Sequence, residues 1–196
     1  MSVQIAVADT KSTEDRPGAY LRLFFALVPD PGVCVALGEL ARTVARASRG
    51  RVVAAQHLHL TLVFLGDVPA TLIPALRAVG DAMPHTGAVL SFDTLGAWRA
   101  SGVAWVAPSV LPATIVALHA ALGTALATAG FMLETRALRP HITLARRCVH
   151  LLPRTRCPPV RWQVDQLCLV GSELHPEGPI YRDIAKWPLT IAAAPG

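Results

Sequence analysis

The chain has 196 residues, of which 53% are hydrophobic and 16% are charged, and its net charge is +5. This composition excludes a disordered chain, and the length predicts one domain or two small lobes sharing one fold. Arg, His, Pro or Asp interrupt the apolar stretches before the ~18 residues of a membrane span are reached. The first residues lack the apolar core of a signal peptide, and the four cysteines show no paired spacing. We therefore expect a cytoplasmic protein with reduced thiols and no membrane partner.

In chain order, the sequence predicts strands interspersed with helices after a flexible N-terminal leader over residues 1–19. The apolar run Arg22–Val28, ended by Pro29, predicts a buried strand. Asp30 followed by Pro31 is typical of a helix N-cap and first helical position. The elements expected next are a helix to about Ser48, a strand at Leu58–Leu65, a helix ending near Met83, a hairpin of Ala88–Trp98 with Val103–Ala107, a helix over Pro112–Ala129, a strand at Pro140–Ala145, a loop through Pro159, and strands near Gln163–Val170 and Tyr181–Trp187.

The order of these elements bears on the fold class. Adjacent strands with segregated helices favour an α+β fold with antiparallel sheets over a doubly wound parallel sheet. We expect residues 20–196 to form a single domain.

Positive charge is concentrated in the segment from Phe131 to Arg161. It holds seven arginines and one acid, Glu134, and so carries +6. A guanidinium can bind a phosphate through two parallel hydrogen bonds. The segment therefore favours a phosphate or nucleic-acid surface, with a solvated loop as the alternative. The arginines are Arg136, Arg139, Arg146, Arg147, Arg154, Arg156 and Arg161.

A four-residue pattern occurs twice, as His59–Leu62 (HLTL) and His141–Leu144 (HITL), each within a predicted strand. Because side chains alternate along a strand, the histidine and threonine of each pattern share one face, and the aliphatic residues face the core. Imidazole can act as acid or base near neutral pH, and a hydroxyl can donate to the non-bridging oxygens of a phosphate. The pair of patterns therefore predicts acid–base chemistry at an anionic group, with no metal or other cofactor required.

Four segments resemble the 2H phosphoesterase superfamily, and within it the RNA 2′,3′-cyclic phosphodiesterases formerly called 2′-5′ RNA ligases. They follow the family's order and span about residues 20–190. The segments are Arg22–Pro29, His59–Gly66, Arg139–Arg146 and Leu169–Leu189. The resemblance implies a bilobal α+β fold, in which two pseudo-symmetric lobes of antiparallel sheet with outer helices flank a central groove. It also implies metal-independent opening of RNA 2′,3′-cyclic phosphate ends to 2′-phosphates.

The resemblance also assigns roles that spacing alone does not. It implies that His59 donates a proton to the O3′ leaving group and that His141 activates water. Thr61, Thr143 and Arg146 are the residues expected to bind the substrate phosphate.

The roles of other residues near the two patterns are left open. Phe64 and Arg146 each lie five residues after a histidine, and strict alternation would turn both away from the groove unless a bulge redirects them. Arg139 precedes a proline, which makes its direction uncertain. His57 and His59 form an H-x-H pair, but no further metal ligand stands at recognisable spacing. The four tryptophans, Trp98, Trp105, Trp162 and Trp187, are interpreted as core residues.

Two alternatives to an RNA end-processing enzyme remain. One is a cyclic phosphodiesterase acting on small nucleotides, and the other is a non-catalytic nucleotide- or RNA-binding module. The partner in each case is RNA or a cyclic nucleotide, and we expect a monomer.

Overall fold

The computed structural model describes residues 19–133, 137–173, 175 and 179–191, so the predicted leader lies outside the described residues except for Ala19. Within the described ranges, nine strands form one sheet in the order β7-β4-β5-β6-β3-β1-β8-β9, and β2 pairs with β6. The strands are β1 (Tyr20–Leu27), β2 (Arg51–Val52), β3 (Leu60–Pro69), β4 (Ala88–Trp98), β5 (Val103–Pro108), β6 (Ile142–Arg146), β7 (Thr155–Val164), β8 (Gln166–Glu173) and β9 (Ile180–Pro188). The helices are α1 (Pro31–Ser48), α2 (Ile73–Asp81) and α3 (Ala113–Thr128), with short 3₁₀ turns η2 (Ala55–His57) and η3 (Ala70–Leu72).

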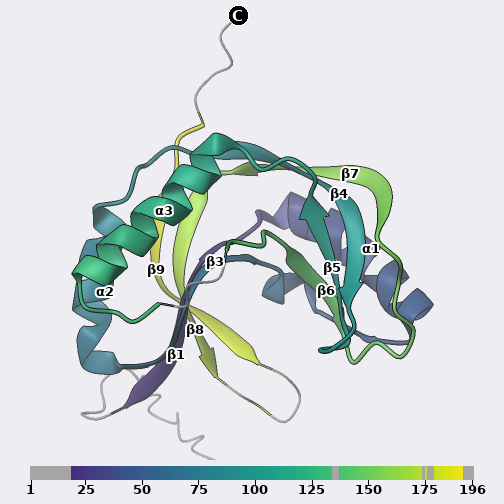
Figure 1. Cartoon of the computed structure of the whole chain (residues 1–196), viewed down its shortest axis with the longest axis horizontal. Helices are drawn as coiled ribbons and strands as arrows, with labels where there is room; N and C mark the ends of the chain where they lie inside the picture. The colour runs from purple at the N-terminus through teal and green to yellow at the C-terminus, as the bar shows by residue number, and fades with distance from the viewer. Residues whose placement is uncertain (1–18, 134–136, 174, 176–178, 192–196) are drawn as a thin grey trace, which may run out of the picture.

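The sheet divides into two lobes (Figure 1). In the His59 lobe, β3, β1, β8 and β9 are covered by α2 and α3. In the His141 lobe, β7, β4, β5, β6 and β2 form the sheet, and α1 packs against β6, β5 and β7. The named strands pair antiparallel throughout. The predicted antiparallel α+β fold of two lobes with outer helices is confirmed.

Helix α1 begins and ends where the sequence indicates. The side chain of Asp30 accepts hydrogen bonds from the backbone N–H groups of Gly32 at 2.8 Å and Val33 at 3.0 Å, which satisfies two otherwise unpaired donors. The helix ends at Arg49 in the left-handed conformation, with φ 48°. Its buried face includes Leu37 and Val44, as the 3.6-residue period predicts.

The predicted β4–β5 hairpin is confirmed, and α2 and α3 also lie where the sequence places them. Gly130 follows α3 with φ 85°, a conformation that glycine adopts without steric cost.

Strand β7 corrects the predicted loop through Pro159. The chain is already extended from Thr155, and Pro158 and Pro159 lie within the strand. Because β7 is the edge strand of the sheet, a missing N–H can face away from the pairing partner, β4. The register with β4 is irregular between Val160 and Arg156, on either side of these prolines.

Several further boundaries differ from the prediction. The expected strand Leu58–Leu65 is β3 over Leu60–Pro69, and the expected strand Pro140–Ala145 is β6 over Ile142–Arg146, so His59 and His141 lie just before their strands. The expected strand Gln163–Val170 is two strands, because β7 ends at Val164 and β8 begins at Gln166. The two-residue strand β2 was not predicted, since it is too short for periodicity to show. No helix among the described residues is long and apolar enough to cross a membrane. The four cysteines form no disulfide in the structure.

Candidate active site

The two H-x-T patterns meet where the lobes join. Strands β3 and β6 pair antiparallel through Leu60 and Ile142, both fully buried. In this register, His59 stands beside Thr143 and His141 stands beside Thr61. These four residues share one face of the strand pair, and Leu60 and Ile142 lie on the other face. Each histidine thus lies next to the threonine of the other pattern.

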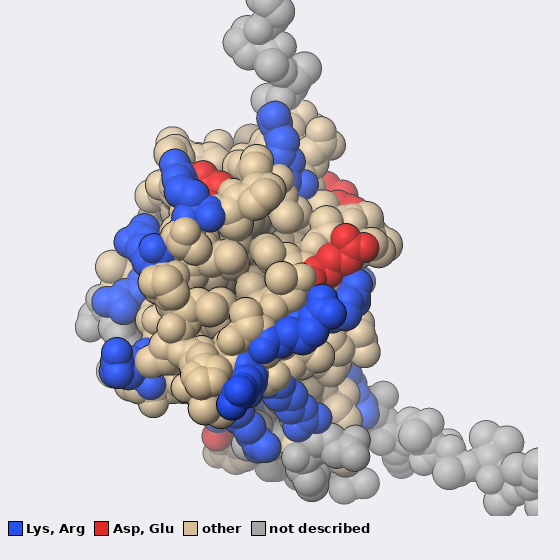
Figure 2. All heavy atoms as spheres, turned by 90° about the vertical axis from the view of Figure 1, so that its right-hand side faces the viewer, with Lys and Arg blue, Asp and Glu red and all other residues tan. Residues whose placement is uncertain are grey.

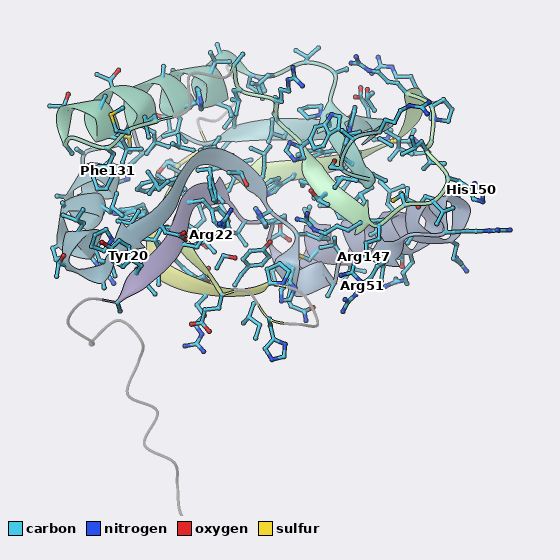
Figure 3. All side chains as sticks on the ribbon, turned by 60° about the horizontal axis from the view of Figure 1, so that its bottom comes forward. Tyr20, Arg22, Arg51, Phe131, Arg147 and His150 are labelled. Atoms are coloured by element: carbon cyan, nitrogen blue, oxygen red, sulfur yellow. The ribbon has the colours of Figure 1, made fainter. Side chains whose placement is uncertain are left out.

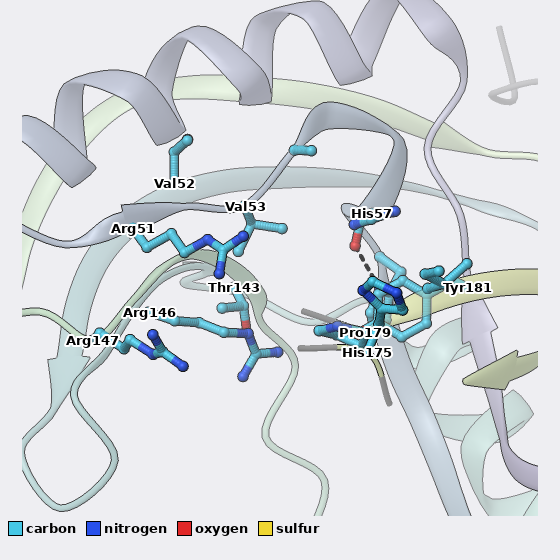
Figure 4. A pocket seen from close by; sticks show the side chains of 13 residues that line it. Arg51, Val52, Val53, His57, Thr143, Arg146, Arg147, His175, Pro179 and Tyr181 are labelled. Atoms are coloured by element: carbon cyan, nitrogen blue, oxygen red, sulfur yellow. Dashed lines mark hydrogen bonds between the residues drawn. The ribbon is translucent and has the colours of Figure 1, made fainter. Parts of the chain in front are cut away.

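Two cavities flank this arrangement. One, of about 440 Å³, is lined by His59, Thr143 and Arg146 (Figure 4). The other, of about 870 Å³, is lined by Thr61 and His141. The five predicted site residues therefore all line one or the other of these two cavities.

Both imidazoles are oriented in the same way by the backbone. Nδ1 of His59 lies 2.8 Å from the carbonyl oxygen of His57, and Nδ1 of His141 lies 2.7 Å from that of Arg139. A carbonyl oxygen can only accept, so Nδ1 donates in both rings. This fixes the tautomer and leaves Nε2 of each ring available for proton transfer.

The surroundings of the histidines favour their neutral forms. Burial lowers the pKa of His59 to about 4; the positive charges of Arg146 and of the neighbouring histidines act in the same direction, against its hydrogen bond to the backbone. Burial also lowers the pKa of His141, and Arg146 contributes again. Arg146 lines the same cavity as His59 and Thr143, and its charge acts on both imidazoles.

Aromatic rings pack against both imidazoles. The ring of His59 lies 4.9 Å from that of Phe24 and 5.0 Å from that of Tyr181. The ring of His141 meets Trp98 edge-on, with 4.5 Å between centroids. Trp98 and Trp105 are half-buried and Trp98 lines the larger cavity, so the interpretation of these two as core residues is wrong, whereas Trp162 and Trp187 are buried as expected.

A matching bulge in β3 and β6 decides the direction of two further residues. The register between β1 and β3 skips Leu62, and that between β5 and β6 skips Leu144, the last residue of each pattern. An extra residue reverses the alternation beyond it. Phe64 and Arg146 consequently line the cavities, as the bulge considered in the sequence would require.

Arg139 and His57, whose roles were left open, also lie at the site. The side chain of Arg139 lines the larger cavity. That of His57 lines the smaller one and meets the edge of Tyr181, with 5.3 Å between ring centroids. Among the residues that the structure describes, no group of three His, Cys, Asp or Glu side chains could hold a metal ion.

Tyr181 and Arg51 are among the residues of the smaller cavity that sequence reasoning missed. Tyr181 contacts His59, and burial raises the pKa of its hydroxyl, while Arg146 opposes this shift by charge and hydrogen bonding. Arg51, in β2, faces Arg146 across the β2–β6 pair. Tyr181 lies in a segment that carries the family resemblance, but no periodicity marks either residue as functional.

The arginines of the +6 segment separate in space. Arg146 and Arg147 line the smaller cavity. Arg156 instead donates to Asp93 at 2.6 Å, an ion pair that ties β7 to β4. Arg136 lies outside the described residues.

Comparison with known proteins supports a family assignment. The model of the 2′-5′ RNA ligase superfamily matches residues 29–176. The RNA 2′,3′-cyclic phosphodiesterase of Escherichia coli is 31% identical over 172 residues, covering 86% of this chain and 97% of the relative. The protein of that name from Thermus thermophilus is 33% identical over 186 residues, covering 86% of this chain and 90% of the relative.

The fold gives the same result. The crystal structure of E. coli LigT complexed with 3′-AMP superposes with a TM-score of 0.77 at 29% identity, covering 87% of this chain and 99% of that one. The family model spans both H-x-T patterns, and the relatives match along nearly their whole length. The chain therefore belongs to the 2′-5′ RNA ligase superfamily.

Proposed function

We propose that this protein is an RNA 2′,3′-cyclic phosphodiesterase that opens the terminal cyclic phosphate to a 2′-phosphate. The observation that carries the proposal is the pair of imidazoles from two lobes, each with Nδ1 bound to a backbone carbonyl and Nε2 free. The names of the relatives from E. coli and T. thermophilus support the reaction class.

In the proposed mechanism, the two histidines exchange protons with water and the leaving group. Nε2 of neutral His141 takes a proton from water as the water oxygen forms a bond to phosphorus. The P–O3′ bond breaks, and O3′ takes the proton from Nε2 of protonated His59. The products are a 2′-phosphate and a free 3′-hydroxyl.

The non-bridging phosphate oxygens carry the charge that the site must stabilise. Thr61 and Thr143 can donate hydroxyl protons to these oxygens from the two sides of the groove. Arg146 adds a permanent positive charge and planar donors. Such fixed donors stabilise the transition state without reorganising during the reaction.

Substrate binding also changes the protonation state of His59 in the proposed mechanism. With a pKa of about 4, His59 is neutral at pH 7 in the free protein and cannot serve as an acid. The negative charge of a bound cyclic phosphate favours the imidazolium and raises this pKa. Protonation of His59 is thus coupled to the arrival of the substrate.

The larger cavity suits the terminal nucleobase. It places two aromatic side chains, Phe64 and Trp98, near His141. Stacking of a base on an aromatic ring contributes about 1–3 kcal/mol and tolerates any base.

We also propose that the protein acts as a cytoplasmic monomer. Size-exclusion chromatography with light scattering would test the oligomeric state.

The proposal is tested with an RNA oligonucleotide ending in a 2′,3′-cyclic phosphate, incubated with the protein in EDTA. We expect complete conversion to a 2′-phosphate, identified by chromatography against 2′- and 3′-phosphate standards. His59→Ala and His141→Ala should each lower turnover by about 10²–10⁴-fold.

His150→Ala is the matched control, because His150 is exposed in the loop after β6 and should retain turnover. A 3′-phosphate product, or activity lost in EDTA and restored by zinc, would contradict the proposed mechanism. Equal turnover in all three variants would contradict the assignment of the histidines.

A further inference from the structure

Arginines line both the smaller active-site cavity and an adjoining surface hollow at the C-terminal end of α1. Arg51 and Arg147 line that cavity beside Arg146. A neighbouring surface hollow is lined by Arg42, Arg46 and Arg49, and the two share Val52. We propose that five of these residues, Arg42, Arg46, Arg49, Arg51 and Arg147, form an arginine track that binds the phosphates of an RNA chain on the 5′ side of its cyclic end.

The start of the track places like charges against each other. Arg51 and Arg146 are direct partners in the β2–β6 register, and side chains at such positions lie on the same face, where like charges are destabilising. The ion pairs found in the described part of the chain involve Arg156, Arg182 and Lys186, and none reaches the track. An anion between Arg51 and Arg146 would relieve this repulsion.

Backbone conformation at two track residues favours glycine, yet arginine is present. Arg49 has φ 48° and Arg147 has φ 54°, and they are the two non-glycine residues with positive φ within the described ranges. The left-handed conformation is disfavoured for residues with a Cβ. Arginine thus occupies two positions where glycine would relieve strain.

The end of α1 is fixed to the segment after β6, which holds the track residues together. The carbonyl oxygen of Ser48 accepts hydrogen bonds from the N–H groups of Val149 at 3.0 Å and His150 at 2.9 Å. At Gly50, an added Cβ would lie 2.8 Å from the sulfur of Cys148, so the segment after α1 and the segment after β6 approach each other closely there. Arg49 and Arg147, which flank these contacts, are consequently held in one rigid region.

The figures agree on this arrangement. Figure 3 labels Arg51 and Arg147 close together, and Figure 4 shows both on the same side of the cavity as Arg146. Figure 2 views the side on which α1 lies, and blue Lys and Arg atoms exceed red Asp and Glu atoms there.

The chemistry of the substrate gives the track its direction, and on this point the inference rests on the proposed function. A 2′,3′-cyclic phosphate is the 3′ end of an RNA, so the chain continues only through O5′ of the terminal nucleotide. With the cyclic phosphate between His59 and His141, the track would bind the preceding phosphates. A cyclic mononucleotide in the cavity would not reach Arg42, Arg46 and Arg49, so this outer part of the track favours a polymeric substrate.

The test is fluorescence anisotropy with a 5′-labelled 12-nucleotide RNA ending in a 2′-phosphate, which is the proposed product and does not turn over. The track variant carries Arg42→Gln, Arg46→Gln and Arg49→Gln. The control variant carries Arg161→Gln, Arg182→Gln and Lys186→Gln, which removes the same charge from residues that line none of the three hollows.

Each phosphate contact contributes about 0.7 to the slope of log K against log salt for a single strand. We expect the slope to fall by about 2 in the track variant and to stay at the wild-type value in the control. Shortening the RNA to two nucleotides should weaken binding by the wild-type protein and make the two variants bind alike. Equal slopes in both variants with the 12-nucleotide RNA would overturn the track and leave these arginines only the role of stabilising the C-terminus of α1.

A second variant separates binding from folding. Arg49→Gly with Arg147→Gly removes two guanidinium groups while relieving the left-handed strain, so the thermal midpoint should not fall. The salt slope should fall by about 1.4. If the wild-type protein fails to open cyclic phosphates while the slope still falls in the variant, the proposed function is refuted and the track is retained. If the wild type turns over but the slope is unchanged in the variant, the track is refuted and the proposed function is retained.

Discussion

His59 is enclosed by aromatic rings, and in the proposed mechanism it also has to carry a proton. Phe24 and Tyr181 enclose its ring, and burial lowers its pKa to about 4. The hydrogen bond to the carbonyl of His57 opposes this shift and holds the ring in place. These contacts hold the imidazole in one orientation and favour its neutral form, and under the proposed function a bound anion would favour its protonated form.

This burial predicts how the free energy of unfolding depends on pH. The unfolded chain binds a proton at His59 near pH 6.5, whereas the folded protein does so near pH 4, so stability falls as pH falls between these values. His59 should account for a loss of about 1.5 kcal/mol between pH 6.5 and pH 5. Urea denaturation of the wild type and His59→Asn at both pH values measures this. An equal loss in the two proteins would show that His59 is not the group responsible.

A second prediction concerns Arg146, whose charge lowers the pKa of both His59 and His141. Arg146→Gln should let both values rise, so both limbs of the kcat/KM profile should move to higher pH. KM should increase in the same variant, because a phosphate donor is lost. An unchanged profile with an unchanged KM would place Arg146 outside the site.

At the scale of elements, a bulge repeated in two strands builds the site. The extra residues Leu62 and Leu144 let β3 and β6 bury consecutive aliphatic residues and then turn Phe64 and Arg146 towards the cavities. The burial patterns of Leu60–Phe64 and Ile142–Arg146 are identical. The two lobes thus share a local structure while presenting an aromatic ring on one side and a cation on the other.

The bulge in β3 predicts the effect of Phe64→Ala. Phe64 is 37% exposed, and Arg22 lies over its ring with 4.8 Å to the centroid. Truncation should therefore cost about 1 kcal/mol or less of stability, whereas a core phenylalanine would cost about 3–5 kcal/mol. KM for the cyclic-phosphate RNA should rise several-fold. Urea denaturation and steady-state kinetics check the two parts, and a large stability loss without a change in KM would mean that Phe64 is a core residue.

At the scale of the whole molecule, the site exists only between the lobes. Strands β3 and β6 join them through the register pair Leu60 and Ile142. Helices α1 and α3 each follow a strand of one lobe and pack on the other, α1 after β1 and α3 after β5. In the proposed mechanism, each lobe supplies one of the two histidines that transfer protons.

Dependence on both lobes predicts that the effects of removing the histidines are not additive. If one proton transfer is lost, the partner imidazole has little left to contribute, so His59→Ala with His141→Ala should be little slower than the slower single variant. Single-turnover rates on the cyclic-phosphate RNA measure this. A double variant whose loss is the product of the single losses would show that the histidines act independently.

The sequence by itself determined the local features of this protein. The capping residue of α1, the β4–β5 hairpin, the helices and the two H-x-T faces follow from period, turn and cap chemistry within short segments, and the +6 segment is visible in composition. The arginines at positions 42, 46, 49 and 51 are equally visible as a run without an acid, but a run of charge does not say which surface it joins.

Only the tertiary structure decided which of these features meet. The strand at Thr155–Val164 tolerates its prolines because it lies at the edge of the sheet, and edge position is a property of the whole sheet. Arg51 faces Arg146, and Tyr181 contacts His59, through pairings between residues 95 and 122 positions apart. Arg156 is bound by Asp93, while Arg147 remains at the cavity. Such long-range contacts arise from packing and register, which no local pattern encodes.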